Sequence, residues 1–408
     1  MCYYFGKEQW GENSLTAKDK GGPGKRQERN TAFRVTSFFV LITVVIALAV
    51  LVYMNYRGID YTELSLDQMI ESIFAKSDES IQGVTAEIGY DIKNEMILGT
   101  SRDTIIKYLD NSVVGLDNAG KKIWGFPFPA TNPYAASADS YTAFADINGK
   151  KLLVIKGKNK RWEIETDEAI LNISINKDGY TAAVHEAGGC KGAITVYDPE
   201  GGVIFTKTYA ERFVLDAQIS SDNREVLINT VDISGARAFS SLEITDIYGS
   251  FKAGIAAQEQ SFFPYVGFMA EGRIAAADEE HLVLLNRDGS TSWNFKYKRV
   301  HSSVTLNREY FVAAVSVQGS KKIFIEVWDK NGRHAISDPI NEIVNIRQYD
   351  DIIAVNTGRE IIFMDPECKS LGKYSPTADI LDLRFLNRIE AAVITRESIH
   401  IFKLGVVD

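Results

Sequence analysis

Hydrophobic residues follow three different patterns along the chain, and each pattern predicts a different kind of element. A single long apolar run lies near the N-terminus, a short helical stripe follows it, and short runs separated by turn residues fill the remainder. The Val, Ile, Tyr and Phe that recur in the short runs favour strands. We therefore predict one transmembrane helix, a stalk over residues 57–84 and a large all-β domain over residues 85–408.

The long apolar run covers residues 35–56, which contain no charged side chain and are flanked by Arg34 and Arg57. A helix of about 20 apolar residues crosses the core of a lipid bilayer, so the run predicts a membrane-spanning helix. A cleaved signal peptide is the alternative. The run exceeds the roughly 7–15 residues of a signal peptide's apolar region, and no small-x-small cleavage site follows it, which favours an uncleaved anchor.

Charge sets the expected orientation of this anchor. Residues 1–34 carry seven basic and four acidic side chains, whereas residues 57–80 carry two basic and six acidic ones. Basic segments stay on the cytoplasmic side of a membrane. The sequence therefore predicts a cytoplasmic tail over residues 1–34, disordered because of its many glycines and charges, and an extracytoplasmic C-terminal domain. The expected location is the cell membrane, with a single pass.

The predicted stalk contains one short amphipathic helix. Leu66, Met69, Ile70, Ile73 and Phe74 follow helical spacing, and Ser65 with Gln68 forms a capping box at the start of the stripe. Two interpretations stay open for this helix. It packs on its own domain, or it serves as a dimerising or partner-binding stalk.

The all-β region contains a recurring four-residue turn between two strands. An Asp or Asn at its first position can hydrogen-bond the turn's own backbone, and a Gly at its last position tolerates positive φ. The turn residues are Asp117 with Gly120, Asp198 with Gly201, Asp246 with Gly249, Asn286 with Gly289, and Asp329 with Gly332. Two weaker copies cover residues 156–159, where Asn159 takes the place of the Gly, and residues 365–368, which end in Cys368.

The spacing of these turns predicts a β-propeller. Their first positions lie 36–48 residues apart, and a period near 40 with about four strands is typical of a propeller blade. Eight inner strands are predicted, near Met96, Tyr134, Ile173, Ala217, Val266, Val304, Val344 and Leu383. Eight blades are favoured, with seven as the alternative. The last unit ends before its outer strand, so we expect a strand near residues 85–92 to close the ring and protect its sheet edges.

Two of the turns continue into a tryptophan. Trp124 follows Asp117 and Gly120, and Trp293 follows Asn286 and Gly289, in an Asp/Asn-x-x-Gly-x-x-x-Trp pattern. This pattern resembles the tryptophan-docking motifs of quinoprotein-type (PQQ-like) eight-bladed propellers, and the repeats are also similar to WD40 repeats. The resemblance implies that the tryptophans lock neighbouring blades together. Anchor and repeats together resemble a family of membrane-anchored propellers of Gram-positive bacteria, a domain of unknown function.

Chemically active groups are scattered rather than clustered. The five histidines lack zinc-ligand spacing, and the acidic residues are spread along turns and strands, so no catalytic, cofactor-binding or metal-binding residue is assigned. The net charge of −9 argues against nucleic acid as a partner. Cys190 and Cys368 are expected to be free thiols, with a disulfide between them as the alternative.

One local cluster is basic. It consists of Lys150, Lys151, Lys156, Lys158, Lys160 and Arg161. Charged side chains on an exposed strand prevent edge-to-edge pairing, so a solvated sheet edge is the favoured interpretation. Contact with an anionic wall polymer or lipid headgroup is the alternative.

Two functional hypotheses follow. In the first, the propeller is a non-enzymatic binding or scaffold module for an envelope protein partner or ligand, because a propeller offers a wide face with variable loops. In the second, suggested by the tryptophan pattern alone, the channel serves a quinone- or metal-dependent oxidoreductase or a sugar-acting enzyme. Fold does not decide between them.

Overall fold

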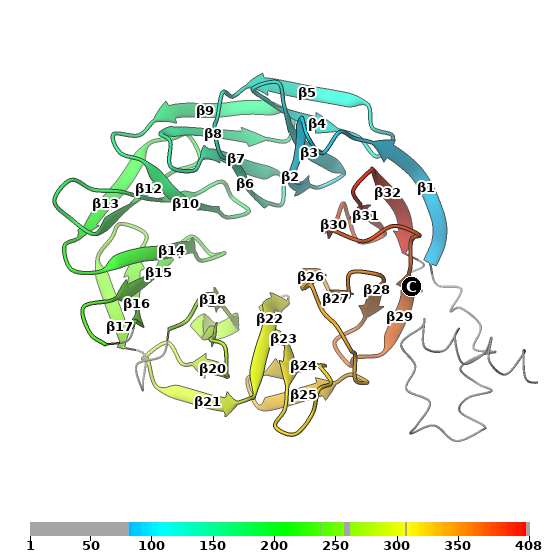
Figure 1. Cartoon of the computed structure of the whole chain (residues 1–408). Coiled ribbons are helices and arrows are strands. Elements are labelled where there is room, and N and C mark those ends of the chain that lie inside the picture. The colour runs from blue at the N-terminus through cyan, green and yellow to red at the C-terminus, as the bar shows by residue number, and fades with distance from the viewer. Residues whose placement is uncertain (1–80, 237, 257–261, 307, 405–408) are drawn as a thin grey trace, which may run out of the picture. The chain divides into compact units, whose positions relative to one another are not determined.

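The computed structural model describes residues 81–236, 238–256, 262–306 and 308–404. The chain divides into two units, Met1–Ala75 and Lys76–Asp408, and all described residues lie in the second. Within them, 32 strands form eight four-stranded antiparallel sheets. The sheets are arranged in a ring (Figure 1). The prediction of an all-β, eight-bladed propeller is therefore confirmed, and the seven-bladed alternative is set aside.

The membrane-related predictions concern another part of the chain. The tail over residues 1–34, the transmembrane helix over residues 35–56 and the stalk over residues 57–80 lie outside the described residues. The residues that the structure describes include no helix of the length and hydrophobicity that crossing a bilayer requires.

The first four blades follow one another directly in sequence. Blade 1 consists of β2 (Glu95–Ser101), β3 (Thr104–Leu109), β4 (Ser112–Leu116) and β5 (Lys122–Pro127). Blade 2 consists of β6 (Pro133–Ala138), β7 (Tyr141–Asp146), β8 (Lys151–Lys156) and β9 (Asn159–Glu165). Blade 3 consists of β10 (Ile170–Ile175), β11 (Thr181–His185), β12 (Gly192–Tyr197) and β13 (Val203–Tyr209). Blade 4 consists of β14 (Phe213–Ile219), β15 (Glu225–Asp232), β16 (Phe239–Asp246) and β17 (Phe251–Ala256).

The remaining blades repeat this order, and the last one is composite. Blade 5 consists of β18 (Tyr265–Phe268), the short 3-10 helix η2 (Ala270–Gly272), β19 (Ile274–Ala277), β20 (His281–Leu285) and β21 (Thr291–Lys296). Blade 6 consists of β22 (Arg299–Leu306), β23 (Tyr310–Ser316), β24 (Phe324–Asp329) and β25 (Gly332–Ile336). Blade 7 consists of β26 (Asn345–Tyr349), β27 (Ile352–Asn356), β28 (Ile361–Met364) and β29 (Ser370–Tyr374). Blade 8 consists of β30 (Asp382–Phe385), β31 (Glu390–Ile394), β32 (Ser398–Leu404) and β1 (Ile81–Gly89).

The first strand of each blade is the innermost. The first strands of blades 1 and 2, 3 and 4, and 6 and 7 contact each other around the centre of the ring (Figure 1). Seven of the eight predicted inner-strand positions fall within these strands, and Val344 directly precedes β26. Because the strands are antiparallel, the loops from first to second strand and the turns from third to fourth strand share one side of the ring. We call this side the turn face.

Blade 8 closes the ring. β1 pairs with β32 from Ile81 opposite Leu404 to Gly89 opposite Ser398, so the start of the propeller supplies the outer strand of its last blade. The predicted closing strand is confirmed, although β1 begins at Ile81, within the range assigned to the stalk. Since β32 ends on the turn face, the paired start of β1 lies there too.

The apolar core lies between blades. Eight clusters of buried side chains fill the eight interfaces between neighbouring sheets. At the closing interface, Ile88 of β1 packs with Ile105 and Leu116 of blade 1. The ring is therefore held by side chains that cross from each blade to the next.

Four of the predicted turns share one backbone geometry, and in the three that begin with Asp the carboxylate also accepts from two backbone N–H groups. At Asp198, the backbone N–H of Gly201 donates to the Asp198 carbonyl (3.0 Å), and the Asp198 carboxylate accepts from the N–H groups of Glu200 and Gly202 (2.9 and 2.8 Å). The last-position glycines have positive φ, +79° at Gly120, +88° at Gly201, +87° at Gly249 and +86° at Gly289. The turn at Asp329 differs, because Asp329 and Gly332 pair directly across a two-residue hairpin.

The two weaker copies of the turn differ in which residue has the positive φ. Cys368 takes the glycine position with φ +59°, and burial raises the pKa of its thiol to about 12. Asn159 does not take that position; Gly157 supplies the positive φ (+58°) in a two-residue hairpin, and Asn159 already begins β9. The turn therefore lies at residues 156–159 as predicted, but its positive φ falls on Gly157 at the second position rather than on Asn159 at the last. Cys190 and Cys368 are free thiols.

Large side chains on outer strands cover the turn of the next blade. Trp162 packs over Gly201, where an added Cβ would lie 2.7 Å from the indole, and the Trp293 indole N–H donates to the Asp329 carbonyl (3.0 Å). Phe205 covers Gly249 in the same way. Trp124 instead packs over Gly115 of its own blade and reaches Phe144 of blade 2.

We predict that Gly201→Ala destabilises the propeller more than Gly189→Ala does. Both glycines have positive φ in blade 3 (+88° and +77°), which costs Ala about 1–2 kcal/mol. Only at Gly201 does the added methyl group meet an indole, and such overpacking costs about 1–3 kcal/mol more. Urea unfolding of the full chain followed by tryptophan fluorescence measures the difference. Equal effects of the two substitutions would refute the docking role of Trp162.

Candidate functional site

Charged loops on the turn face of blades 4, 5 and 6 surround two adjoining cavities of about 310 and 270 Å³. They are lined by loop residues 220–225, 268–273, 308–310 and 329–331, together with Leu284 of β20 and Arg287 of the blade 5 turn. Both cavities are bordered by Met269, Ala270, Glu271 and Arg308. We call this continuous depression the blade 4–6 groove.

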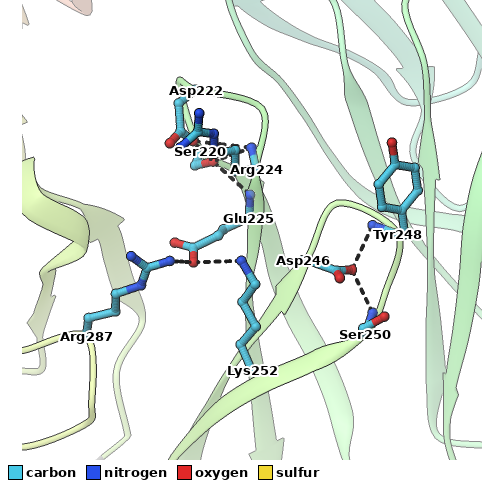
Figure 2. A network of polar contacts seen from close by, with 9 residues as sticks. All are labelled: Ser220, Asp222, Arg224, Glu225, Asp246, Tyr248, Ser250, Lys252 and Arg287. Carbon is cyan, nitrogen blue, oxygen red and sulfur yellow. Dashed lines mark hydrogen bonds and ion pairs between the residues drawn. The ribbon is translucent and has the colours of Figure 1, made fainter.

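Glu225 is the centre of a charge network on one side of the groove (Figure 2). Its side chain is only 7% exposed, yet the carboxylate forms ion pairs with Lys252 (3.2 Å) and with Arg287 of blade 5. An isolated buried carboxylate is costly, so these two cations provide the counter-charge that the burial of Glu225 requires. The network therefore links the turn of blade 5 to the first loop of blade 4.

The loop before Glu225 is organised by a serine. The Ser220 hydroxyl donates to the Asp222 carboxylate (2.6 Å) and accepts from the backbone N–H groups of Arg224 and Glu225 (3.2 and 3.0 Å). The hydrogen bond from Ser220 holds the pKa of Asp222 below its usual value. Asp222 and Arg224 thus present opposite charges at fixed positions along the groove.

The shared border of the two cavities is conformationally strained. Glu271 and Arg308 have φ of +61° and +62°, although neither is glycine. The Glu271 carboxylate is paired with Arg273 (2.6 Å) and Lys330 (3.2 Å); hydrogen bonds from Lys330 and Arg273 lower its pKa. Arg308 donates to Ser221, joining blade 6 to blade 4 across blade 5. Such strain is characteristic of binding and active sites.

Two exposed aromatic residues stand on the neighbouring turn of blade 4. Tyr248 is 76% exposed and Phe251 is 64% exposed. The Asp246 carboxylate fixes their turn by accepting from the N–H groups of Tyr248 and Ser250 (2.9 and 2.8 Å; Figure 2). The Tyr248 ring points away from the charge network, so it is available for contact with another molecule.

The predicted turn residues divide between the groove and the remaining blades. The turn of Asn286 and Gly289 carries Arg287 to Glu225, Asp329 lines the groove, and Asp246 with Gly249 supports Tyr248. Trp293 holds the Asp329 turn from blade 5. The other predicted residues, Asp117, Gly120, Trp124, Asp198, Gly201 and Gly332, lie outside the residues that line the groove.

Polar side chains also occupy the inner strands. Asp382 is paired with Arg347 (3.0 Å) and Arg384 (2.8 Å), while Asp216 accepts hydrogen bonds from Gln218 (2.7 Å) and Asn172 (3.3 Å). Burial raises the pKa of Asp216. In the part of the chain that the structure describes, no three His, Cys, Asp or Glu side chains are grouped as a metal would require. Each of these inner carboxylates is engaged by one partner on its own strand and one on the inner strand of a neighbouring blade.

A tyrosine contact that repeats between blades was not predicted from the sequence. Tyr209, Tyr297 and Tyr374, each at or just after the fourth strand of a blade, bond with a polar side chain on the third strand of the next blade. The partners are Glu243 (3.1 Å), Glu326 (2.5 Å) and His400 (2.9 Å). The sequence does contain a signal for this contact: each tyrosine lies 9–11 residues after the first residue of the turn between the third and fourth strands of its blade.

The comparison with protein families is decisive for the propeller region. Residues 90–404 match the model described as a family of unknown function (DUF5711). The chain belongs to this family. No curated protein matches the sequence.

Solved propellers share the fold of this DUF5711 member at low sequence identity. BamB from Moraxella catarrhalis is 14% identical with a TM-score of 0.54, and the match covers 80% of this chain and 99% of BamB. The C-terminal WD40 domain of Sif2 is 11% identical with a TM-score of 0.54, covering 80% and 97%. Sqt1 from Chaetomium thermophilum is 10% identical with a TM-score of 0.54, covering 79% and 99%. At these identities the likeness extends to the fold alone.

The groove network makes a quantitative prediction. Replacing both cations of Glu225, as Lys252→Gln with Arg287→Gln, leaves a nearly buried carboxylate without a counter-charge and is expected to destabilise the propeller by about 3 kcal/mol. The control Lys330→Gln removes an exposed cation from Glu271 and should cost at most about 0.5–1 kcal/mol. Urea midpoints of the full-length variants test this. A double variant as stable as the control would show that Glu225 does not organise the groove.

Proposed function

We propose that this protein is a membrane-anchored, extracytoplasmic binding platform that acts without catalysis. Its binding surface is the blade 4–6 groove together with Tyr248 and Phe251. The partner is an envelope protein that presents a polar, charged segment to the groove and an apolar side chain to the aromatic pair.

The exposed aromatic pair carries this proposal. Exposed tyrosine and phenylalanine next to arginine is the composition of protein-binding hot spots, because aromatic rings bury large areas at a low cost in conformational entropy. Tyr248 and Phe251 are 76% and 64% exposed, although their turn is firmly held by Asp246. The aromatic surface is thus preorganised for contact, while the charged groups of the groove provide specificity.

The form of the groove also favours binding over catalysis. The carboxylates of Glu225 and Glu271 are each paired with two cations, so neither stands free as an acid or base. Opposite charges alternate along the loops and are held on a closed, rigid ring. A fixed charge pattern of this kind selects a complementary partner and sets the register of the complex.

The proposed membrane anchor is supported by the amino-acid sequence. Residues 35–56 form the proposed transmembrane helix, with residues 1–34 in the cytoplasm, as the apolar run and the basic tail indicate. Tethering a propeller to the membrane raises its effective concentration toward other envelope proteins. Weak contacts made by a shallow groove would then suffice for stable association.

We predict that in-cell chemical cross-linking of the full-length protein captures a specific envelope protein. Tyr248→Ala with Phe251→Ala should reduce its recovery by at least about tenfold, since a hot-spot truncation costs about 2 kcal/mol or more. Ile233→Ala is the control, because Ile233 is 55% exposed on the blade 4 loop of the opposite face. Purification followed by mass spectrometry identifies the captured protein.

The same sample separates the proposal from its enzymatic alternative. An optical spectrum and a metal analysis of the purified protein are expected to show no chromophore and no stoichiometric metal. A bound quinone or metal, with no partner under any growth condition, would contradict the binding platform. Extraction by alkaline carbonate would separately contradict the membrane anchor.

A further inference from the structure

A third cavity, of about 640 Å³, lies on the turn face of blades 1, 2 and 3. It is open to solvent and is bordered by Arg102 of blade 1, residues 139–141 and 156–159 of blade 2, and residues 177–178 of blade 3. We call it the blade 1–3 cleft. Loops from three blades meet there, so the ring itself fixes its width.

The charge of this cleft is opposite to that of the whole chain. Four basic side chains line it, Arg102, Lys156, Lys158 and Lys177, against the two acidic residues Asp139 and Asp178, which gives +2. The whole chain carries −9. The blade 1–3 cleft is therefore a local basic surface on an acidic protein.

The acidic side chains of the cleft have hydrogen-bond partners within the protein, whereas two of its lysines have no carboxylate partner among the described residues. Arg102 and Asp139 neutralise each other through a two-pronged contact of 2.9 and 2.7 Å. The Asp178 carboxylate accepts from the neutral amide of Asn223 (2.9 Å). Lys158 and Lys177 are exposed, and neither has a carboxylate partner among the described residues. Two ammonium groups thus stay available for an external anion.

The floor of the cleft is an aromatic ring that holds the third lysine in place. The Lys156 ammonium lies 4.8 Å from the centre of the buried Tyr141 ring. Gly179 also packs closely against this ring, because a Cβ there would lie 2.5 Å from it, and its φ of +91° suits glycine. The Tyr141 ring therefore positions the Lys156 ammonium group beside the cleft.

The basic cluster seen in the sequence is only partly responsible for this surface. Lys156 and Lys158 line the cleft, whereas Lys151 lies at the other end of β8 and Lys150 bonds the Asp167 carbonyl. Lys160 and Arg161 lie on the outer strand β9 and pair with Glu163 and Glu200. These four residues do not line the cleft, whereas Arg102 and Lys177 from the neighbouring blades do.

The position of β1 brings this surface within reach of a membrane. β1 begins at Ile81 on the turn face, in blade 8, which adjoins blade 1 (Figure 1). Residues 57–80 separate it from the proposed transmembrane helix and span at most about 80 Å when fully extended. This length is enough for the turn face of blades 1–3 to reach the bilayer.

We propose that the blade 1–3 cleft binds the phosphate groups of anionic phospholipids in the membrane that anchors the protein, with Lys156, Lys158 and Lys177 as the donors. The proposal rests on the membrane anchor of the proposed function. Lysine ammonium groups are effective phosphate ligands. Because the Debye length is about 8 Å at physiological ionic strength, the local +2 acts on headgroups although the whole chain is acidic.

Lysine acylation of the full-length protein in nanodiscs tests the proposal. One set of nanodiscs contains phosphatidylcholine alone, and the other an equimolar mixture with phosphatidylglycerol. Acylation of Lys158 and Lys177 is expected to slow by about fivefold in the anionic discs, as expected for one basic residue near an anionic surface, and to recover in molar salt. Lys191 and Lys321, in second-to-third-strand loops on the opposite face, are the control lysines and should react equally in both.

Matched variants identify the cleft as the cause. In Lys158→Gln with Lys177→Gln the cleft charge falls to zero, and the protection of Lys156 by anionic lipid should be lost. Lys191→Gln with Lys321→Gln removes the same charge from the opposite face and should leave that protection unchanged. All four side chains are in loops, and the thermal midpoint of each variant verifies that the ring is intact.

Two results would overturn the proposal. One is equal acylation of Lys158 and Lys177 in both lipids; the other is equal protection of the control lysines, which would mean unspecific adsorption. Protection by soluble glycerol phosphate in neutral discs, with none from anionic lipid, would assign the cleft to free phosphate esters and would also refute the membrane source. Carbonate extraction reports on the anchor separately, so its failure and that of the cleft are distinguishable.

Discussion

The pairing of β1 with β32 is the interaction on which the other features of this propeller depend. Without β1, blade 8 would end in an open strand edge, and Ile88 would be missing from the interface with blade 1. Each of the eight interfaces is filled by side chains from two sheets, so a gap at one interface loosens its neighbours in turn. The closing strand therefore converts a row of sheets into a rigid ring.

Rigidity of the ring gives the turn face its functional character. Outer-strand side chains such as Trp162 and Trp293 hold the turn of the next blade, and these turns carry or support the charged loops. Strained residues such as Glu271 and Arg308 keep their positive φ because packed sheets on either side support their loops. The proposed anchor precedes β1 in sequence. β1 begins on the turn face, which also carries the blade 1–3 cleft and the blade 4–6 groove.

The fold was predictable from sequence where local chemistry repeats. The Asp-x-x-Gly turn uses its own side chain and backbone, so its spacing predicted the blades, and the incomplete last unit predicted closure. At residues 156–159 the turn was placed correctly, but the positive φ was expected at Asn159 and falls on Gly157, because a two-residue hairpin replaces the longer turn. The cytoplasmic tail and the transmembrane helix stay predictions, since they lie outside the described residues.

The candidate sites were much less predictable than the fold. Glu225 and Arg287 are 62 residues apart, and Ser221 and Arg308 are 87 apart, so only the closed ring brings them together. The basic cluster was visible as a sequence feature, but Lys177 joined the blade 1–3 cleft from another blade. The sequence contains no signal for Tyr248, because its exposure is visible only in the folded structure.

Amide hydrogen exchange of the full-length protein, resolved by peptide, tests the central claim that β1 is an integral part of the ring. We expect the amides of β1 to exchange as slowly as those of β31 and β32, and all three strands to lose protection together when urea destabilises the protein. Rapid exchange in β1 while β31 stays protected would show a loosely attached outer strand. The propeller would then be stable without closure, and the link between anchor and turn face would be contradicted.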